Sequence, residues 1–299
     1  MAATRARFAD GRMHFQHGPI DLIVAADGHP HAVQSAHDGA WNRFTTVLDE
    51  LVAELPRLRE PVHARCAVDG DIARRMWHAC APHGDRFITP MAAVAGSVAD
   101  ELVASYRCPG IRRAWVNNGG DIALYLAPDT SVDVGLFADL ARFDPRQWRG
   151  TIAVDGRFSI IDTMPVRGIA TSGWRGRSFS LGIADSVTVL ARTAAEADAA
   201  ATMIANAVDV DDPRIVRRPA STLKDDSDLG DLLVTVDVPP LDAALVGRAL
   251  DAGLARADAL RDRGLITACA MVCQGALRTV GRDRLWHGPR FSPLTLEAA

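Results

Sequence analysis

Trp115-Val-Asn-Asn-Gly-Gly-Asp-Ile122 is the stretch that says most about how this 299-residue chain folds. It places two amides, two glycines and a carboxylate between the strand-forming runs 114–116 and 122–126. Asn-Gly between such runs is typical of a hairpin turn. Glycines also let a ligand approach the backbone, whose N–H groups suit a phosphate or a ring carbonyl. The stretch therefore predicts either a plain turn or a ligand-binding loop formed by Asn117, Asn118, Gly119, Gly120 and Asp121.

Residues before this loop predict one hairpin and then three helices. Asp10-Gly11 between short apolar runs indicates a hairpin turn at the start of the chain. From Trp41 the apolar residues recur every three or four positions, which predicts an amphipathic helix that ends before Pro56. Two further helices are expected over 71–81 and 91–106.

Residues after the loop predict strands first and helices later. Strands are expected over 151–163, 166–172 and 186–190, and helices over 196–208 and 241–260. The apolar run 265–273 fits a buried strand or a buried helix, and 211–231 is expected to be an exposed loop or insertion. Because strands and helices come in blocks without regular alternation, we expect an α+β fold: a single domain over 1–299 whose largely antiparallel sheet packs against helices.

The overall composition narrows the kinds of partner. Hydrophobic residues make up 48% and charged residues 23%, as in ordinary globular proteins. The net charge of -4 and the absence of a basic cluster predict no nucleic acid and no anionic membrane as partner. No stretch is long and apolar enough for a membrane span or a signal sequence, so a cytoplasmic protein is expected. The five cysteines include no CxxC pair and are expected to be reduced thiols.

A second polar feature falls on the helix expected over 196–208. Asp198 and Thr202 are four residues apart and therefore lie on one helix face. Their oxygens suit Mg²⁺ or Ca²⁺. The structural alternative is that the carboxylate interacts with the helix dipole and the hydroxyl bonds to the preceding turn.

A third polar feature follows the strand expected over 166–172. Its small polar residues and guanidinium groups could together hold a phosphate or a carboxylate. The residues concerned are Thr171, Ser172, Gly173, Arg175 and Arg177. No nucleophile elbow surrounds Ser172, so nucleophilic hydrolysis has little support.

In this order, the three features resemble the ApbE superfamily, whose best-known members are Mg²⁺-dependent FAD:protein FMN transferases. The family shows an Asn-x-Gly-Gly-Asp loop, a Thr-Ser-Gly strand end, and a Ser-Val-Thr-Val segment that leads into Ala-Asp-Ala-x-Ala-Thr. Here these stand at 117–121, 171–173, 186–191 and 197–202. The whole chain resembles more closely an uncharacterised cytoplasmic branch allied to ApbE, recognisable by ITPMAAVAG, VNNGGDIAL and ATSGWRGRSFSLGIADSVTVLA.

The resemblance implies a T-fold-related domain that binds FAD or FMN with Mg²⁺ and passes FMN to an acceptor protein. It implies Asp198 and Thr202 as metal ligands, completed by a main-chain oxygen near Ala95, and Asp121 beside them at the catalytic centre. The loops 117–121 and 171–177 would hold the nucleotide. Two departures matter: the family's helix Lys is Ala95 here, and its His-x-x-Asp-Pro-Arg-Thr-Gly stretch is replaced by 177–185.

Three functional interpretations therefore remain open. The first is a flavin-nucleotide transferase or a hydrolase that cleaves the FAD pyrophosphate. The second is a protein that keeps the pocket, has lost the phosphoryl chemistry, and binds or converts a small heterocyclic acid or a sulfur-pathway metabolite. The third is a non-enzymatic partner protein. A homodimer is expected only because dimers are common.

Overall fold

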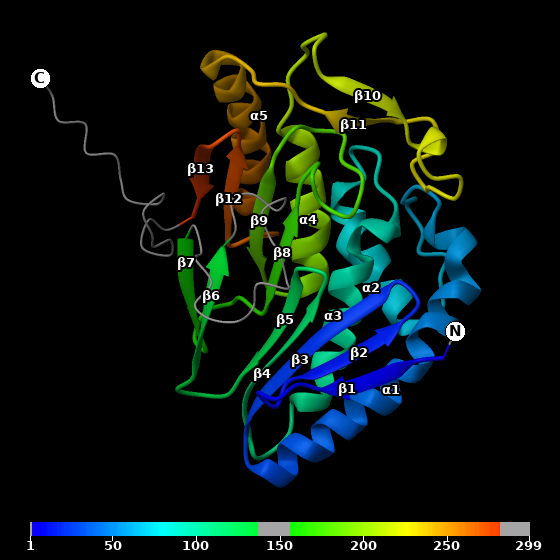
Figure 1. The fold of residues 1–299 in the computed structure, drawn as a ribbon, viewed down its shortest axis with the longest axis vertical. Helices are drawn as coiled ribbons and strands as arrows, with labels where there is room; N and C mark the ends of the chain where they lie inside the picture. The colour runs from blue at the N-terminus through cyan, green and yellow to red at the C-terminus, as the bar shows by residue number, and fades with distance from the viewer. Residues whose placement is uncertain (1, 137–155, 282–299) are drawn as a thin grey trace, which may run out of the picture.

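An antiparallel sheet of nine strands forms the centre of the computed structural model, which describes residues 2–136 and 156–281 (Figure 1). Each neighbouring pair of strands in this sheet runs antiparallel, which confirms the predicted α+β class. The strands, in their order across the sheet, are β1 (Thr4–Arg7), β2 (Met13–His17), β3 (Ile20–Gly28), β4 (Ile111–Asn118), β5 (Asp121–Leu126), β8 (Gly168–Ser172), β9 (Ser186–Ala191), β12 (Ala268–Cys273) and β13 (Ala276–Val280).

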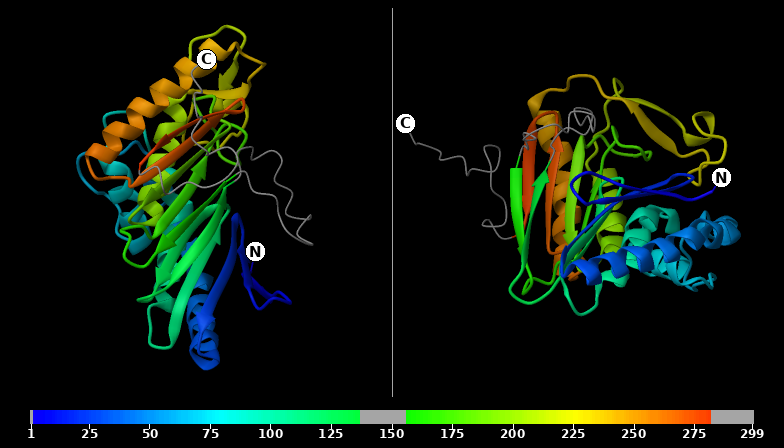
Figure 2. Two further views of the ribbon diagram at one scale, coloured as in Figure 1. Left: turned by 90° about the vertical axis from the view of Figure 1, so that its left-hand side faces the viewer. Right: turned by 60° about the horizontal axis from the view of Figure 1, so that its bottom comes forward.

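Five α-helices lie on one face of this sheet (Figure 2). Alternation along β4 explains part of this packing, because Ala114 and Val116 are buried toward the helices. At the far end of the sheet the second face is covered as well, since Phe158 and Ile160 of a separate hairpin pack against Leu190. The helices are α1 (Pro30–Leu58), α2 (Asp71–Cys80), α3 (Val94–Val103), α4 (Ala194–Ala207) and α5 (Ala243–Asp262), and the hairpin consists of β6 (Ser131–Leu136) and β7 (Gly156–Ile161).

The sheet narrows between β5 and β8, where two halves of the molecule meet. The pairing there comprises Ile122 with Ile169 and Ala123 with Gly168. One large core cluster lies beneath α1, α2 and α3, and another beneath α4 and α5. Helices α3 and α4 approach closely across the junction, because a Cβ on Gly96 would lie 2.2 Å from the Ala194 carbonyl oxygen. The polar loops predicted above all lie near this junction.

Helix α1 is longer than predicted at both ends. It begins at Pro30, where proline suits the first helical position, and small buried residues such as Ala36 and Ala40 continue the inward face before Trp41. It also continues past Pro56 to Leu58, so the predicted end before Pro56 is wrong. Pro56 has no N–H, so the Val52 carbonyl lacks its helical hydrogen bond. Val52 is 54% exposed, and water can solvate that oxygen. Leu58 is fully buried.

The remaining predictions of helices and strands agree largely with the structure, with two changes. The helix predicted over 91–106 is divided into a 3₁₀ turn η2 (Pro90–Ala93), α3 and a second turn η3 (Ala104–Tyr106). The run 265–273, for which a buried strand and a buried helix are both predicted, contains the strand β12 at 268–273. The segment 211–231 is not wholly irregular, since it contains β10 (Val216–Pro219), paired with β11 (Leu233–Asp237), and the turn η6 (Ala220–Thr222). Of the strand predicted over 151–163, residues 151–155 lie outside the described residues.

No helix within residues 2–136 and 156–281 is long and apolar enough to cross a membrane.

Candidate functional site

The turn between β4 and β5 is a tight hairpin, as the Asn-Gly pattern indicates. Asn118 pairs with Asp121, and Gly119 and Gly120 form the two-residue loop with φ of 66° and 120°. Positive φ at both positions explains the glycines. Asn117 Oδ1 accepts a hydrogen bond of 2.8 Å from the Gly120 N–H and braces the turn. The hairpin thereby holds the two ends of its loop, Asn118 and Asp121, in fixed positions.

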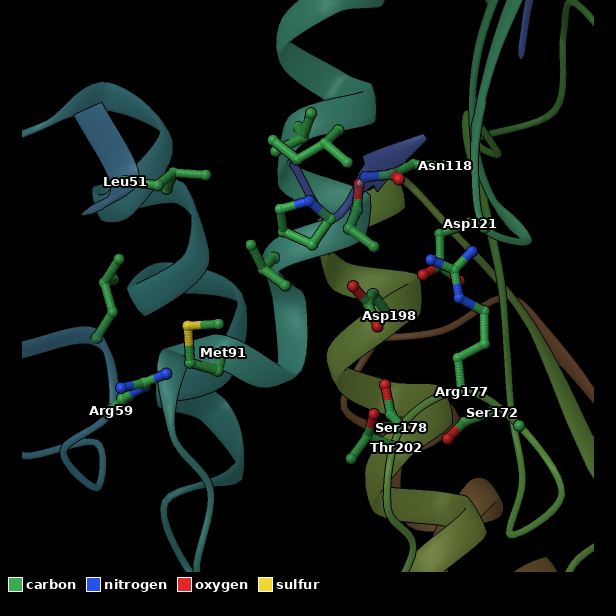
Figure 3. Close-up of a pocket in the computed structure, with 18 of the residues that line it drawn as sticks. Leu51, Arg59, Met91, Asn118, Asp121, Ser172, Arg177, Ser178, Asp198 and Thr202 are labelled. Carbon is green, nitrogen blue, oxygen red and sulfur yellow. Dashed lines mark hydrogen bonds between the residues drawn. The ribbon is translucent and has the colours of Figure 1, made fainter. Parts of the chain in front are cut away.

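A cavity of about 650 Å³ opens beside this hairpin at the junction of the two halves. A second chamber of about 300 Å³ adjoins it and shares eleven of its lining residues. Figure 3 shows how side chains from α4, the hairpin and the segment after β8 point into the same space. The residues predicted from the sequence that line the larger chamber are Ala95, Asn118, Gly119, Asp121, Thr171, Ser172, Gly173, Arg177, Asp198 and Thr202.

The opposite wall of the cavity is apolar. It comes from the C-terminal half of α1 and from the start of α3. Leu48, Leu51, Leu55 and Val94 line it together with Met91 of the turn η2, and Figure 3 shows Leu51 and Met91 on the side away from Asp121 and Asp198. A cavity with one apolar wall and one wall of carboxylates and amides suits a ligand that combines a ring system with polar substituents.

Two carboxylates, buried Asp121 and half-buried Asp198, stand on the polar wall. Asp121 Oδ1 accepts a hydrogen bond of 3.2 Å from the Thr171 N–H, and Asp198 Oδ2 accepts one of 2.9 Å from the Gly96 N–H. Burial raises the pKa of Asp121 to about 7. Burial and then the charge of Asp121 raise the pKa of Asp198 well above its usual range. These carboxylates would be stabilised by a cation between them.

The oxygen atoms around Asp198 fit a hard metal ion. Asp121, Asp198 and Thr202 supply carboxylate and hydroxyl oxygens, which Mg²⁺ prefers. Across residues 2–136 and 156–281, no group of three or more His, Cys, Asp and Glu side chains could hold a metal, so water would have to complete the ligand shell. The main-chain oxygen of Ala95 already accepts a hydrogen bond of 3.1 Å from Asn118 Nδ2. A carbonyl oxygen has two lone pairs, so this bond leaves one of them for the predicted part in metal binding.

The two arginines predicted to bind the ligand lie in different surroundings. Arg177 lines both chambers, points toward Asp121 (Figure 3), and has no ion-pair partner among the described residues. A Cβ on Gly119 would lie only 3.4 Å from Arg177 Nη1. Arg175 lies away from both linings: its guanidinium stacks 4.9 Å from the Trp174 ring centroid, and Nε is 3.6 Å from Asp185 Oδ1.

No sequence motif marks several of the residues that line the cavity. Arg59 follows α1 and Ser178 follows Arg177, and both line the two chambers. Lys224 and Asp226 belong to 211–231, and they are exposed, as expected, while they also line the cavity. The apolar stripe of α1 is read from sequence as core, and nothing in its periodicity distinguishes a core face from a cavity wall.

The fold and the cavity together define an α+β protein whose two halves enclose a cavity with one apolar and one polar wall. Its relatives agree with the sequence resemblance: the family model described as AbpE bacteria matches residues 5–279, and the chain belongs to that family. It is 38% identical over 219 residues to a UPF0280 protein of Methanopyrus kandleri, covering 71% of this chain and 80% of that protein. It is 34% identical over 183 residues to a UPF0280 protein of Methanothrix thermoacetophila, covering 58% and 70%.

Among solved structures, the chain is similar to the flavinyl transferase ApbE of Pseudomonas stutzeri in its apo form. The sequence identity is 12%, the TM-score is 0.45, and the match covers 97% of this chain and 95% of that one.

Proposed function

We propose that this protein binds a flavin or a related nucleotide in the cavity between its two halves, together with Mg²⁺. The observation that carries the proposal is the pair of carboxylates, buried Asp121 and half-buried Asp198, on a cavity wall opposite an apolar one. A flavin or adenine ring would pack against the leucines of α1, and the phosphates would lie toward Arg177.

In this proposal Asp198, Asp121 and Thr202 hold the metal ion, which neutralises phosphate charge when it is bound. Thr171 to Gly173 and Gly119 line the chamber beside the carboxylates and offer hydroxyl and backbone groups to the nucleotide. Arg177 places its guanidinium beside the developing negative charge of a displaced phosphate. The reaction class that follows is FMN transfer to an acceptor protein or cleavage of the FAD pyrophosphate.

The alternative is a protein that keeps this cavity without phosphoryl chemistry and binds or converts a small heterocyclic acid or sulfur-pathway metabolite. It is favoured by the replacement of the family's helix Lys by Ala95, which leaves no cation at that point of α3. A non-enzymatic partner role is the third interpretation. Cytoplasmic location, a single domain over 1–299 and a homodimer belong to the same proposal.

The test is isothermal titration of the purified protein with FAD, FMN and ADP, each with and without Mg²⁺. Asp198→Asn is the informative variant, because an amide oxygen can still accept the Gly96 hydrogen bond while the charge is lost. We expect Mg²⁺ to tighten nucleotide binding in the wild type and to have little effect in Asp198→Asn. Absence of heat with all three nucleotides would refute the proposal.

Two further results separate the alternatives. Tight binding that is indifferent to Mg²⁺ and to Asp198 would favour a binding protein without phosphoryl chemistry. Incubation with FAD, followed by chromatography for FMN and AMP and by mass spectrometry for a flavinylated acceptor, tests for turnover. An exposed acidic residue, Asp225, supplies the matched control as Asp225→Asn, which should keep the response to Mg²⁺.

A further inference from the structure

The chain contains a single lysine, Lys224, among 33 basic residues, and this lysine lines both chambers of the cavity. All other cationic positions of the chain are arginine. Arginine and lysine differ in chemistry: guanidinium is a rigid fork, whereas an ammonium group is a compact charge that can turn its three donors toward a ligand. The one ammonium side chain thus lies at the place where a ligand would be bound.

Lys224 belongs to residues 220–231, which we call the strap. Two side-chain contacts hold the strap against the body of the protein. Arg59 Nη2 lies 2.7 Å from Asp226 Oδ2, and Thr89 Oγ1 donates a hydrogen bond to Asp228. Figure 1 shows this yellow segment below β10, beside the end of α1. The strap is therefore a wall of the smaller chamber, tied at two points.

Charged side chains of both signs line the smaller chamber: the three cations Arg59, Arg177 and Lys224, and the four carboxylates Asp121, Asp198, Asp226 and Asp228. Asp226 lies 3.6 Å from Lys224 Nζ and also pairs with Arg59, so one carboxylate serves two cations. Arg177 lines the same two chambers and adds a third cation. An anion bound by both Lys224 and Arg177 would offset the charge on Lys224 that Asp226, which is shared with Arg59, compensates only in part.

Neutral donors complete the chamber. Ser178 and Thr202 line it with hydroxyl groups. Asn206 Oδ1 accepts a hydrogen bond of 2.9 Å from the Leu181 N–H, which leaves the side-chain amide nitrogen as a donor for a ligand. This number of donors exceeds what the two oxygens of a carboxylate accept, and it suits a phosphate group.

We infer that Lys224 is a specificity-determining residue whose ammonium group binds a phosphate group of the ligand, on the strap side of the smaller chamber and across from Arg177. The inference rests on the proposed nucleotide site and adds a recognition element from a segment outside the three loops. Asp226 acts as a positioning residue, because its carboxylate contacts both Lys224 and Arg59.

The experiment titrates inorganic pyrophosphate into the wild type, Lys224→Met, Lys224→Arg and the control Asp225→Ala. Lys224→Met should weaken binding by about tenfold, which corresponds to one charged hydrogen bond. Lys224→Arg should recover part of the affinity, and Asp225→Ala should match the wild type. Equal affinity in Lys224→Met and wild type would overturn the inference, and so would a wild type that binds no pyrophosphate. Far-UV circular dichroism confirms that each variant is folded.

A second measurement uses the uniqueness of the lysine. Acetylation by an N-hydroxysuccinimide ester can modify one lysine side chain in this protein, and peptide mass spectrometry reports its extent. Pyrophosphate should slow the acetylation of Lys224. If Lys224 were acetylated as fast in saturating pyrophosphate as without it, the inference would be contradicted.

The two proposals fail separately. If FAD, FMN and ADP give no heat while pyrophosphate binding depends on Lys224, the nucleotide proposal is wrong and the phosphate subsite stands. If the nucleotides bind and Lys224→Met binds them and pyrophosphate as tightly as the wild type, the subsite is wrong and the nucleotide proposal stands.

Discussion

The carboxylate of Asp198 on α4 accepts a hydrogen bond of 2.9 Å from the backbone N–H of Gly96 in the first turn of α3. The exchange is reciprocal, because Asp100 on α3 accepts from the first two N–H groups of α4, those of Ala194 and Ala195, at 3.1 and 2.9 Å. Each helix thus caps the other. Asp198 therefore stabilises the junction of the two halves whether or not it also binds a metal ion.

Gly96 is the position where the packing of α3 on α4 leaves no room. Gly96→Ala would place its Cβ 2.2 Å from the Ala194 carbonyl oxygen, a backbone atom that cannot move away alone. We expect the free energy of unfolding to fall by at least ~2 kcal/mol, as for overpacked sites. Urea unfolding followed by circular dichroism measures it.

Gly247 in α5 is the matched control, because a Cβ there meets nothing within 4 Å. Gly247→Ala should raise the free energy of unfolding by about 0.5 to 1 kcal/mol, since alanine is the better helix former. If both variants had the same stability, the close approach of the two helices would be wrong.

Asp100 tests the capping itself. Asp100→Ala leaves two N–H groups of α4 without an acceptor in a buried position, so we expect a loss of about 2 kcal/mol in the free energy of unfolding. Asp100→Asn keeps one acceptor oxygen and should lose less. The same urea titration compares the two variants, and an alanine variant as stable as wild type would show that the caps contribute nothing.

His83, which is 2% exposed, makes a destabilising contribution in mild acid. Burial, followed by the charges of Arg256 and Arg263, lowers the pKa of His83 from 6.5 to about 4. Above pH 6.5 the imidazole is neutral in both states. As the pH falls toward 4, only the unfolded chain takes up the proton, which reduces stability by about 3 kcal/mol.

His83→Gln removes this titration, so acidification from pH 6.5 to 4 should cost the variant about 3 kcal/mol less stability than the wild type, whose Asp121 and Asp198 contribute with the opposite sign. Urea midpoints at several pH values measure the slope. The exposed His63 serves as a control, since His63→Gln should retain the wild-type slope. A His83→Gln slope identical to that of the wild type would assign the acid sensitivity to other groups.

Arg177 and Arg175 allow a paired test of the ligand site. Arg177→Ala should weaken FMN and ADP binding about tenfold through loss of a charge-assisted hydrogen bond and leave riboflavin, which has no phosphate, unaffected. Arg175→Ala should leave FMN affinity unchanged, because its guanidinium stacks on Trp174 and lies outside the cavity lining. If calorimetry showed that Arg175→Ala weakens FMN binding more than Arg177→Ala does, the placement of the phosphate beside Arg177 would be contradicted.

Local sequence patterns were sufficient for much of the fold. The Asn-Gly-Gly pattern of 117–121 predicts the hairpin, because glycine suits a turn with positive φ. The β-branched residues on either side predict the strands. Local patterns failed where distant residues decide the outcome. Helix α1 passes Pro56 because Leu58 is buried by other elements, and the 91–106 helix is broken beside Asp198, which is about a hundred positions away.

The sequence by itself determined the kinds of group at the candidate site: the amides and glycines of 117–121, the Thr-Ser-Gly strand end, and Asp198 with Thr202 on one helix face. Only the tertiary structure decided which of these share a cavity. In the structure, leucines of α1 form an apolar wall of the cavity, and Lys224 of the strap also lines it. Arg175 stacks on Trp174 and lies outside the cavity lining. The physical reason is range: turn and helix preferences depend on neighbours in the chain, whereas a cavity depends on segments that meet only when the whole chain packs.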